Sequence, residues 1–307
     1  MGARLIANKL KEYGIELGER TVRYHLKILD ERGLTRPLQR RDGREITPLG
    51  IEEVQNALVS DQVGFVLEKI ELLAFNTSFD VNTLSGLVPV NVSLFPKASF
   101  NKALREMKKA FEKGLCISNL VAMAPGGERL GNVLIPEGKV GLATVCSLII
   151  NGSLLKAGIP IDSRFGGVLQ IRNNKPLRFV DLIYYSGSTL DPSEVFIRAG
   201  MTDVSSAIKE GNGKVLANFR ELPAQCGTLA GETIDKLKKA GISGVIMMGN
   251  PSEKVCGIDV GLNRIGMILL GGLTPIAVVA EAGIDIENKA MSTLLDYKSF
   301  IKFGELL

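Results

Sequence analysis

The stretch GERTVRYHLKILDERGL, residues 18–34, decides the first part of the fold. Val22, Leu26 and Leu29 recur at intervals of three and four residues, which predicts a helix with one buried face. The residues between them are mostly polar or basic, and Gly33 is a typical helix end. A long polar and basic face is typical of a recognition helix that enters the major groove of DNA. A solvent-exposed amphipathic helix has the same pattern, so the neighbouring segments must distinguish the two.

The preceding segment favours the DNA-binding interpretation. Residues 3–13 predict a helix that buries Leu5, Ile6 and Leu10, and residues 14–18 predict a turn. Helix, short turn and helix in this order form a helix-turn-helix. Winged helices ordinarily carry one further helix ahead of this pair, and the sequence leaves no room for it. We therefore expect a late-assigned start, a shortened sequence or an incomplete winged helix.

The segment that follows predicts a wing. Residues 34–47 contain two short strand patterns joined by Asp42 and Gly43, a pair that accepts the positive φ of tight hairpin turns. Thr47 as N-cap and Pro48 in the first turn predict the start of another helix. A basic hairpin directly after a recognition helix is the wing of a winged helix. Residues 1–60 are therefore predicted to form a winged helix-turn-helix domain.

Positive charge is concentrated in this N-terminal part. The whole chain has a net charge of only +4, but residues 20–44 contain eight Lys or Arg and three Asp or Glu. A basic cluster of this density fits contact with DNA phosphates, while a solvated surface is the alternative. The residues predicted to contact DNA are Arg20, Thr21, Arg23, Tyr24, His25, Lys27, Arg40, Arg41 and Arg44.

Composition narrows the class of protein. Of the 307 residues, 45% are apolar and 23% charged, and no apolar run is long enough for a transmembrane helix or a signal peptide. The four cysteines form no CxxC pair and there is one histidine, which argues against a metal site. Isolated cysteines are typical of a reducing compartment, so we expect a cytoplasmic protein.

Residues 61–307 contain an internal repeat. With an offset of 127 residues Asn91 aligns with Asn218, and with an offset of 125 the Ala-Gly-Ile triplet at 157–159 aligns with that at 282–284. Glycines and prolines between these points align in the same order. The period is too long for a solenoid unit and indicates a duplicated half-domain.

Each repeat, at about 88–163 and 215–288, predicts two strands around a helix, a third strand and a short helix. In the first repeat, Asn151-Gly152 leaves a hairpin turn open as an alternative to the short helix. Between the repeats, Asn173-Asn174 predicts a hairpin turn. The predicted fold class is α/β (α+β), with an N-terminal winged helix-turn-helix followed by an internally duplicated, pseudo-symmetric regulatory domain.

The residue inventory argues against an enzyme. His25 lies in the winged helix, so the larger domain has no Ser-His or Cys-His arrangement. The sequence contains neither the GxxxxGK[ST] phosphate loop nor a GxGxxG that opens a helix after a strand. Nothing in the sequence points to a catalytic carboxylate pair.

The larger domain does offer places for a small anion. Gly271 and Gly272 follow an apolar strand and lead into a helix, whose free N–H groups favour an anion. Arginines provide bidentate contacts to a carboxylate. The same features also fit ordinary turns and surface ion pairs. The candidate effector contacts are Arg164, Gly166, Gly167, Ser188, Asn218, Arg220, Gly271, Gly272 and Thr274.

One further basic run stands in the first repeat. Its members are Lys102, Arg105, Lys108, Lys109 and Lys113. Such a run is typical of a solvated helix face, and contact with DNA is the alternative.

Several strings together resemble the archaeal nitrogen regulatory repressor family, NrpR. The strings are LGERTVRYHLKILDERGLT (17–35), EGKVGLATVCS (137–147), LLKAGIPID (154–162), RFGGVLQI (164–171), KVLANFRELPA (214–224) and NKAMSTLLDY (288–297). The resemblance covers essentially the whole chain. It implies a winged helix followed by one regulatory domain, in a family whose members carry one or two.

The resemblance also implies a function. The family represses nitrogen-assimilation genes in methanogenic archaea by binding inverted-repeat operators as a dimer or higher oligomer. Its effector, 2-oxoglutarate, releases the repressor, and no other cofactor is implied. In single-domain forms a second protein with regulatory domains can associate. The alternative, favoured by the missing first helix, is a regulatory subunit that does not bind DNA itself. Neither interpretation involves a membrane.

Overall fold

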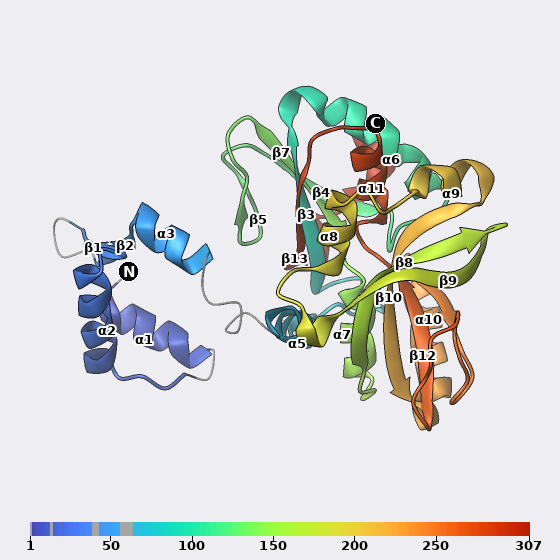
Figure 1. The fold of residues 1–307 in the computed structure, drawn as a ribbon, viewed down its shortest axis with the longest axis horizontal. Coiled ribbons are helices and arrows are strands. Elements are labelled where there is room, and N and C mark those ends of the chain that lie inside the picture. Colours follow the sequence, from blue (N-terminus) through green and yellow to red (C-terminus); the bar gives the residue numbers. More distant parts are fainter. Residues whose placement is uncertain (1, 13–14, 39–42, 56–63) are drawn as a thin grey trace. The chain divides into compact units, whose positions relative to one another are not determined.

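The computed structural model describes residues 2–12, 15–38, 43–55 and 64–307. Contacts between residues divide the chain into two compact units, 1–62 and 63–307 (Figure 1). Within the described ranges, no helix combines the length and the apolar character needed to cross a membrane. The two units are described separately.

The first unit is a helix-turn-helix with a two-stranded hairpin. Its elements are α1 (Ala3–Glu12), α2 (Glu19–Glu31), β1 (Thr35–Pro37), β2 (Arg44–Ile46) and α3 (Pro48–Gln55). The helix predicted for residues 18–34 is confirmed: Val22 and Leu26 are buried, and the helix ends before Gly33, which has a φ of +70°. The side chain of Thr47 accepts a hydrogen bond from the Gly50 N–H (3.0 Å) at the start of α3. The predicted hairpin tip falls mostly in residues 39–42, outside the described residues.

The prediction for α1 was partly wrong. Its buried positions are Ala3 and Ala7, with Ile6 and Leu10 packed against them. Leu5, which was predicted to be buried, is 52% exposed. The small alanines allow α1 and α2 to approach closely, so the larger side chain at position 5 turns to the solvent side.

The second unit consists of two five-stranded sheets with helices. Its helices are α5 (Phe65–Asn76), α6 (Phe100–Glu112), α7 (Leu148–Lys156), α8 (Pro192–Arg198), α9 (Val204–Glu210), α10 (Gly227–Lys239) and α11 (Thr274–Glu281), with 3-10 turns η1 (Lys97–Ser99), η2 (Tyr185–Gly187), η3 (Ala224–Cys226), η4 (Tyr297–Ser299) and η5 (Phe303–Leu306). Its strands are β3 (Leu87–Pro96), β4 (Leu120–Pro125), β5 (Arg129–Leu130), β6 (Val133–Leu134), β7 (Lys139–Val145), β8 (Asp162–Arg172), β9 (Lys175–Tyr184), β10 (Gly213–Pro223), β11 (Val245–Met248), β12 (Arg264–Leu270), β13 (Glu287–Asp296) and β14 (Ile301–Lys302).

The two halves of this unit have the same order of elements. An offset of 127 residues superimposes the sequence bounds of α6 on those of α10, and an offset of 125 superimposes those of β7 on those of β12. The predicted fold class, a winged helix followed by a duplicated domain of mixed helices and strands, is confirmed. Every pairing between described strands is antiparallel, so the fold is of the α+β kind.

The halves exchange their last strands. One sheet has the order β13-β3-β7-β4-β14 and the other β11-β12-β10-β8-β9. Strand β8 of the first half therefore pairs with β10 of the second, and β13 of the second half pairs with β3 of the first. Because each half completes the other's sheet, the two halves form one cooperative unit.

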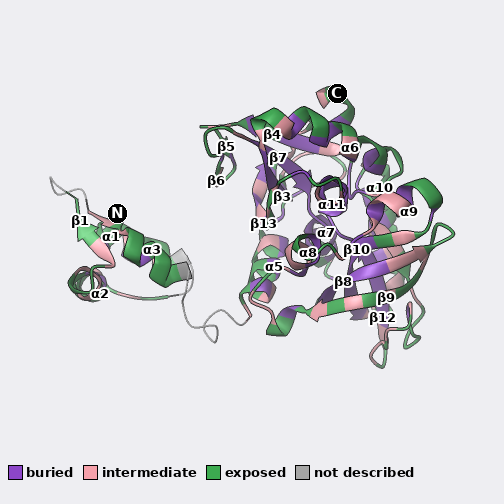
Figure 2. Ribbon diagram, turned by 45° about the horizontal axis from the view of Figure 1, so that its top comes forward, coloured by how far each residue is buried: buried purple, intermediate pink, exposed green. Residues whose placement is uncertain are grey.

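Helices α7, α8 and α11 lie between the two sheets (Figure 2). On the outer face of the first sheet, Val90, Val92 and Leu94 form a small separate core with Leu130 and Ile135, which belong to the β5–β6 excursion. Because successive side chains of a strand point to opposite faces, Asn91, which lies between Val90 and Val92 on β3, points to the inner face of the sheet. The inner faces of both sheets, and the helix starts between them, define the centre of the domain.

The structure also tests the two hairpin turns that were considered in this unit. Asn173 and Asn174 both have positive φ (51° and 60°), which confirms the predicted hairpin turn. The alternative hairpin at Asn151-Gly152 was wrong, because both residues lie within α7. A Cβ on Gly152 would lie 2.5 Å from Cβ of Thr77, so the glycine permits close packing of α7 against the end of α5.

Candidate functional site

The exposed face of α2 carries the side chains that were predicted to contact DNA. Arg20, Thr21, Arg23, Tyr24, His25 and Lys27 are all exposed. Two of the cations form ion pairs one helical turn away, Arg23 with Glu19 and Lys27 with Glu31. Exposed pairs of this kind contribute only about 0–1 kcal/mol, so a phosphate group competes with them readily.

The wing arginines divide into two groups. Nε of Arg44 donates to Asp30 Oδ2 (2.6 Å), and the hydroxyl of Thr35 donates to Oδ1 of the same carboxylate (2.6 Å). Burial alone would raise the pKa of Asp30, but these two hydrogen bonds outweigh it and hold the pKa below its ordinary value. Arg44 therefore fastens the wing to α2. Arg40 and Arg41 lie outside the described residues.

A small polar pocket lies at the centre of the second unit, where the two halves meet. Its volume is about 20 Å³, room for about one water molecule. Its lining comes from both sheets, the starts of α7 and α11, and the segment from η2 to α8. The lining residues are Asn91, Cys146, Ser147, Leu148, Tyr185, Asp191, Ser193, Asn218, Arg220, Gly272, Leu273, Ala290 and Met291.

Arg220 is the cation of this pocket. It is 1% exposed, and its guanidinium carbon lies 5.2 Å from the centre of the Tyr185 ring. Nε donates to Asn151 Oδ1 (3.4 Å) and Nη1 to the Phe219 carbonyl (3.3 Å). No carboxylate of the described residues lies within ion-pair distance. A buried charge without a counter-ion costs several kcal/mol, so this guanidinium is poised for an anion.

Two asparagines face each other across the pocket from equivalent positions of the two halves. Both polar atoms of the Asn218 amide have a partner: Oδ1 accepts from the Tyr185 hydroxyl (2.6 Å) and Nδ2 donates to Ser147 Oγ (3.3 Å). Asn91 Oδ1 accepts from the Met291 N–H (2.9 Å), but its buried Nδ2 has no hydrogen-bond partner among the described residues. Such a donor is costly to bury unless a ligand or water accepts from it.

The starts of two helices, α7 and α11, also line the pocket. Ser147 directly precedes α7, and Gly272 and Leu273 directly precede α11. The first N–H groups of a helix lack intrahelical partners and favour negative charge. Gly272 is required here, because a Cβ would lie 2.6 Å from Asn91 Nδ2. The free N–H groups predicted at the start of α11 are not found, because those of Thr274 and Ile276 donate to the Gly271 and Leu273 carbonyls and Pro275 has none. The helix starts therefore contribute their dipoles, while Arg220 and Asn91 contribute hydrogen-bond donors suited to a carboxylate.

Burial raises the pKa of three acidic groups around the pocket. Burial raises the pKa of the Cys146 thiol to about 11 and that of the Tyr185 phenol to about 12. Burial also raises the pKa of Asp191, which accepts hydrogen bonds from the Ser193 and Glu194 N–H groups and caps α8. In the described part of the chain no cluster of three or more His, Cys, Asp or Glu could hold a metal ion.

The structure brings three of the nine predicted effector residues into this pocket: Asn218, Arg220 and Gly272. Gly166 lies next to it, where a Cβ would be 2.9 Å from Pro192 and 3.1 Å from the Tyr185 hydroxyl. Gly271 packs on Leu216. The Thr274 hydroxyl is buried and donates to the Leu216 carbonyl (3.4 Å).

The last three predicted residues also lie outside the pocket lining. They are Arg164, Ser188 and Gly167. Arg164 lines a separate pocket and pairs with Glu221 (3.1 Å), a buried carboxylate on β10. The hydroxyl of Ser188 bonds within its own loop, to Leu190. A Cβ on Gly167 would lie 2.7 Å from the Phe179 ring, so this glycine serves strand packing.

Sequence reasoning missed the other half of the pocket, although the repeat carried a signal for it. Asn91 aligns with Asn218 at the offset of 127, and Ser147 aligns with Gly272 at the offset of 125. A predicted ligand position in one repeat therefore marks its partner in the other. Tyr185 and Asp191 come from the segment between the repeats, where no such signal exists.

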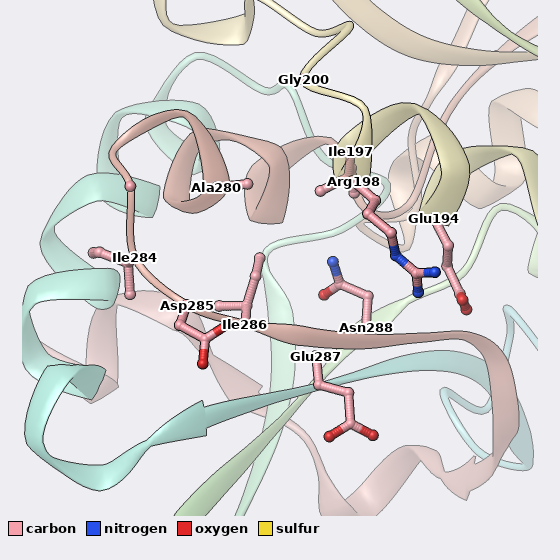
Figure 3. Close-up of a pocket in the computed structure, with 11 residues that line it drawn as sticks. Glu194, Ile197, Arg198, Gly200, Ala280, Ile284, Asp285, Ile286, Glu287 and Asn288 are labelled. Carbon is pink, nitrogen blue, oxygen red and sulfur yellow. The ribbon is translucent and has the colours of Figure 1, made fainter.

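A larger groove beside β13 is less suited to an anion. It has a volume of about 490 Å³ and is lined by Glu194, Asp285 and Glu287 against the single cation Arg198 (Figure 3). Glu287 is already engaged by Lys139 (2.9 Å), whose hydrogen bond lowers the pKa of this carboxyl. The excess of carboxylates would repel a dianion.

Comparisons with known proteins identify both units. Residues 63–302 match the family described as NrpR regulatory domains NRD1 and 2, and residues 1–54 match the family described as the ribonuclease R winged-helix domain. A crystal structure of a nitrogen repressor-like protein from Methanococcus jannaschii is similar to this chain with a TM-score of 0.66 and 29% identity, covering 78% of this chain and 98% of that one.

Curated relatives extend over nearly the whole chain. The global nitrogen regulator NrpRI of Methanosarcina mazei is 41% identical over 97% of this chain and 92% of its own length. The global nitrogen regulator NrpR of Methanococcus maripaludis is 36% identical over 98% of this chain, which spans only 52% of that longer protein. The chain therefore belongs to the NrpR family of global nitrogen regulators.

Proposed function

We propose that this regulator is a cytoplasmic repressor that binds inverted-repeat operator DNA through α2 and is released when 2-oxoglutarate occupies the central pocket. We further propose that it acts as a homodimer or higher oligomer, because an inverted repeat presents two equivalent half-sites about one DNA turn apart. We also propose that a second protein of the same family can associate with this chain and add regulatory domains.

DNA binding is supported by the exposed face of α2. Six side chains able to reach phosphates or base edges share this face, and Val22 and Leu26 on the opposite face hold the helix against α1. The wing hairpin is tied to the same helix through Arg44 and Asp30. A recognition helix supported in this way presents its polar face as a rigid surface.

The observation that supports effector binding is the buried Arg220, which has no carboxylate partner in the part of the chain that the structure describes. A carboxylate placed beside it would receive charge-assisted hydrogen bonds, each contributing about 1.5–3 kcal/mol. The unpaired Nδ2 of Asn91 would supply a further donor from the other half. The second carboxylate of the dianion would lie near the starts of α7 and α11, where the helix dipoles favour negative charge.

The size of the pocket implies movement. At about 20 Å³ it holds a water molecule, whereas a five-carbon dicarboxylate needs several times that space. Tyr185 and Asp191 cover the pocket from the segment between β9 and α8. We propose that this segment moves outward when the ligand enters. Because the ligand then binds the open form better than the closed one, it shifts the population between them. We further propose that DNA binds the closed form better, so that by linkage 2-oxoglutarate weakens DNA binding.

The experiment is fluorescence anisotropy of a labelled inverted-repeat promoter fragment, titrated with the chain at fixed salt, with and without millimolar 2-oxoglutarate. We expect tight binding that 2-oxoglutarate reverses. Arg20→Ala with Lys27→Ala provides the control, because both side chains are exposed and the double variant should fold while binding DNA more weakly.

The alternative, a regulatory subunit that associates with a partner repressor, makes a different prediction in the same assay. The chain alone would bind neither specific nor unrelated duplexes, while 2-oxoglutarate would still bind to it in calorimetry. Binding of DNA that is insensitive to 2-oxoglutarate would instead contradict the effector part of the proposal.

A further inference from the structure

Helix α6 carries an unbroken stripe of positive charge. Lys102, Arg105, Lys109 and Lys113 are spaced by three, four and four residues, so they share one side of the helix. All four are exposed, while the opposite face buries Ala103, Met107 and Ala110 in the main core. We name these four residues the α6 stripe. With a rise of about 1.5 Å per residue it is about 16 Å long.

The charges of the α6 stripe are not neutralised within the protein. Glu106 lies one helical turn from both Lys102 and Lys109, but it is half-buried and forms no ion pair with them among the described residues. Glu112 pairs with Lys108 (3.8 Å) at the side of the stripe. None of the four stripe cations forms an ion pair with a carboxylate in the part of the chain that the structure describes. The stripe is therefore a patch of four cations beside one half-buried carboxylate, with a positive net charge.

The equivalent helix of the second half shows that the fold does not require such a stripe. At the offset of 127, the four positions on α10 are Leu229, Glu232, Lys236 and Ala240, whose formal charges cancel. Both helices have 13 residues and bury the corresponding positions, Ala103 and Met107 in one and Ala230 and Ile234 in the other. The two helices pack against the core through equivalent positions, yet only α6 carries a row of cations along its exposed side.

We propose that the α6 stripe binds the phosphate backbone of duplex DNA, so that the regulatory domain adds sequence-independent contacts to those of the winged helix. This inference rests on the proposed function, since it assumes that the chain binds DNA. A row of point charges about 16 Å long can span several phosphates, because duplex DNA carries one charge per about 1.7 Å of its axis.

The surroundings of the stripe favour duplex DNA over other polyanions. The exposed positions of α6 are Asn101, Lys102, Arg105, Lys108, Lys109 and Glu112, all polar. A single-stranded nucleic acid would need exposed aromatic side chains for base stacking, and a protein partner would need an apolar centre to the interface. A charged surface without either matches backbone contact alone.

The test compares two triple variants of the full chain with the same change of net charge. Lys102→Gln, Arg105→Gln and Lys109→Gln neutralise the stripe, and Lys236→Gln, Lys238→Gln and Lys239→Gln neutralise three cations of α10. The affinity for the labelled operator duplex is measured between 50 and about 300 mM salt. Circular dichroism melts and calorimetry with 2-oxoglutarate establish that both variants fold and keep their effector site.

We expect the stripe variant to lower the slope of log K against log salt by about 2–3, since each lost phosphate contact removes about 0.9. The affinity at moderate salt should fall at least about tenfold, and the α10 variant should leave the slope within about 0.5 of the wild-type value. Equal slopes for wild type and stripe variant, or equal losses in the two variants, would overturn the inference while leaving the proposed function intact. A wild-type chain that binds no duplex would overturn both.

Discussion

The two halves of the regulatory domain share a fold but differ in the chemistry they direct inward. Asn91 and Asn218 occupy equivalent positions on β3 and β10, and both face the central pocket. Two residues farther along each strand, the first half has Ser93, which donates to Asn288 Oδ1 (2.7 Å). The second half has the buried Arg220, which has no carboxylate partner among the described residues. Since the first half forms the same strand with a serine, the fold does not need the arginine. Burying the Arg220 charge costs free energy. Because the fold does not require this charge, we infer that it serves a ligand.

The largest effect is expected when this difference is removed. Arg220→Met should weaken 2-oxoglutarate binding about 100-fold. Among the described residues that line the pocket, Arg220 is the only buried cation, and the variant removes it. The unliganded variant should be as stable as the wild type or more so, by up to about 4 kcal/mol, since an apolar side chain replaces a buried charge. Calorimetry and chemical denaturation measure the two quantities.

Ser93→Ala serves as the control at the equivalent position of the first half. It should leave 2-oxoglutarate binding within about twofold and cost about 1 kcal/mol of stability for the lost hydrogen bond. Unchanged ligand affinity in Arg220→Met would remove the reason for placing the effector in the central pocket.

An intermediate effect is expected for the asparagine pair. Asn91→Asp keeps an oxygen to accept from the Met291 N–H but replaces the unpaired Nδ2 by a second oxygen. The affinity for 2-oxoglutarate should fall about tenfold, because a donor to the ligand is lost and a negative charge is added. Equal affinity in this variant, measured by calorimetry above pH 7, would show that the Asn91 side of the pocket is not used.

The smallest effect concerns protonation. Burial raises the pKa of Asp191 in the folded chain, so between its ordinary and raised values the folded state binds more protons than the unfolded state and stability falls as pH rises. An anionic ligand nearby should raise this pKa further. Affinity for 2-oxoglutarate should therefore increase a few-fold as pH falls from neutrality towards the raised pKa of Asp191.

Asp191→Asn tests the origin of this dependence. Asparagine is an equally good N-cap, so α8 should remain folded. The variant should bind 2-oxoglutarate more tightly at neutral pH and with less dependence on pH. If the affinity of the variant depended on pH as steeply as that of the wild type, another group would be responsible for the titration. The nearest candidate is Glu194, whose pKa is also raised by burial.

Much of the architecture could be predicted because it depends on local patterns. The spacing of Val22 and Leu26 predicts α2, and the pair Asn173-Asn174 predicts the hairpin between β8 and β9. Leu5 shows the limit of such reasoning, since two alanines on the same helix took the buried positions. Hydrophobic periodicity predicts that a helix has a buried and an exposed face. It does not predict which side chains of that helix let a neighbouring helix pack most closely.

The site was less accessible for a topological reason. Arg164 and Arg220 look equally suitable in the sequence, yet the exchange of β8 and β13 places them on strands of one sheet with different surroundings. The pairing of β8 with β10 shifts register between Phe219 and Arg220, next to the pocket. Strand exchange and such irregularities depend on pairing between distant segments, which leaves no local trace. The same holds for Tyr185 and Asp191, which reach the pocket from between the repeats.

The most direct measurement is a crystal structure of this chain with 2-oxoglutarate. We predict one ligand carboxylate at hydrogen-bond distance from Arg220, about 2.7–2.9 Å between nitrogen and oxygen, with Asn91 Nδ2 donating to the same ligand and the segment carrying Tyr185 and Asp191 displaced outward. A ligand bound elsewhere, in the groove beside β13 or in the pocket that Arg164 lines, with the central pocket still closed, would contradict the account.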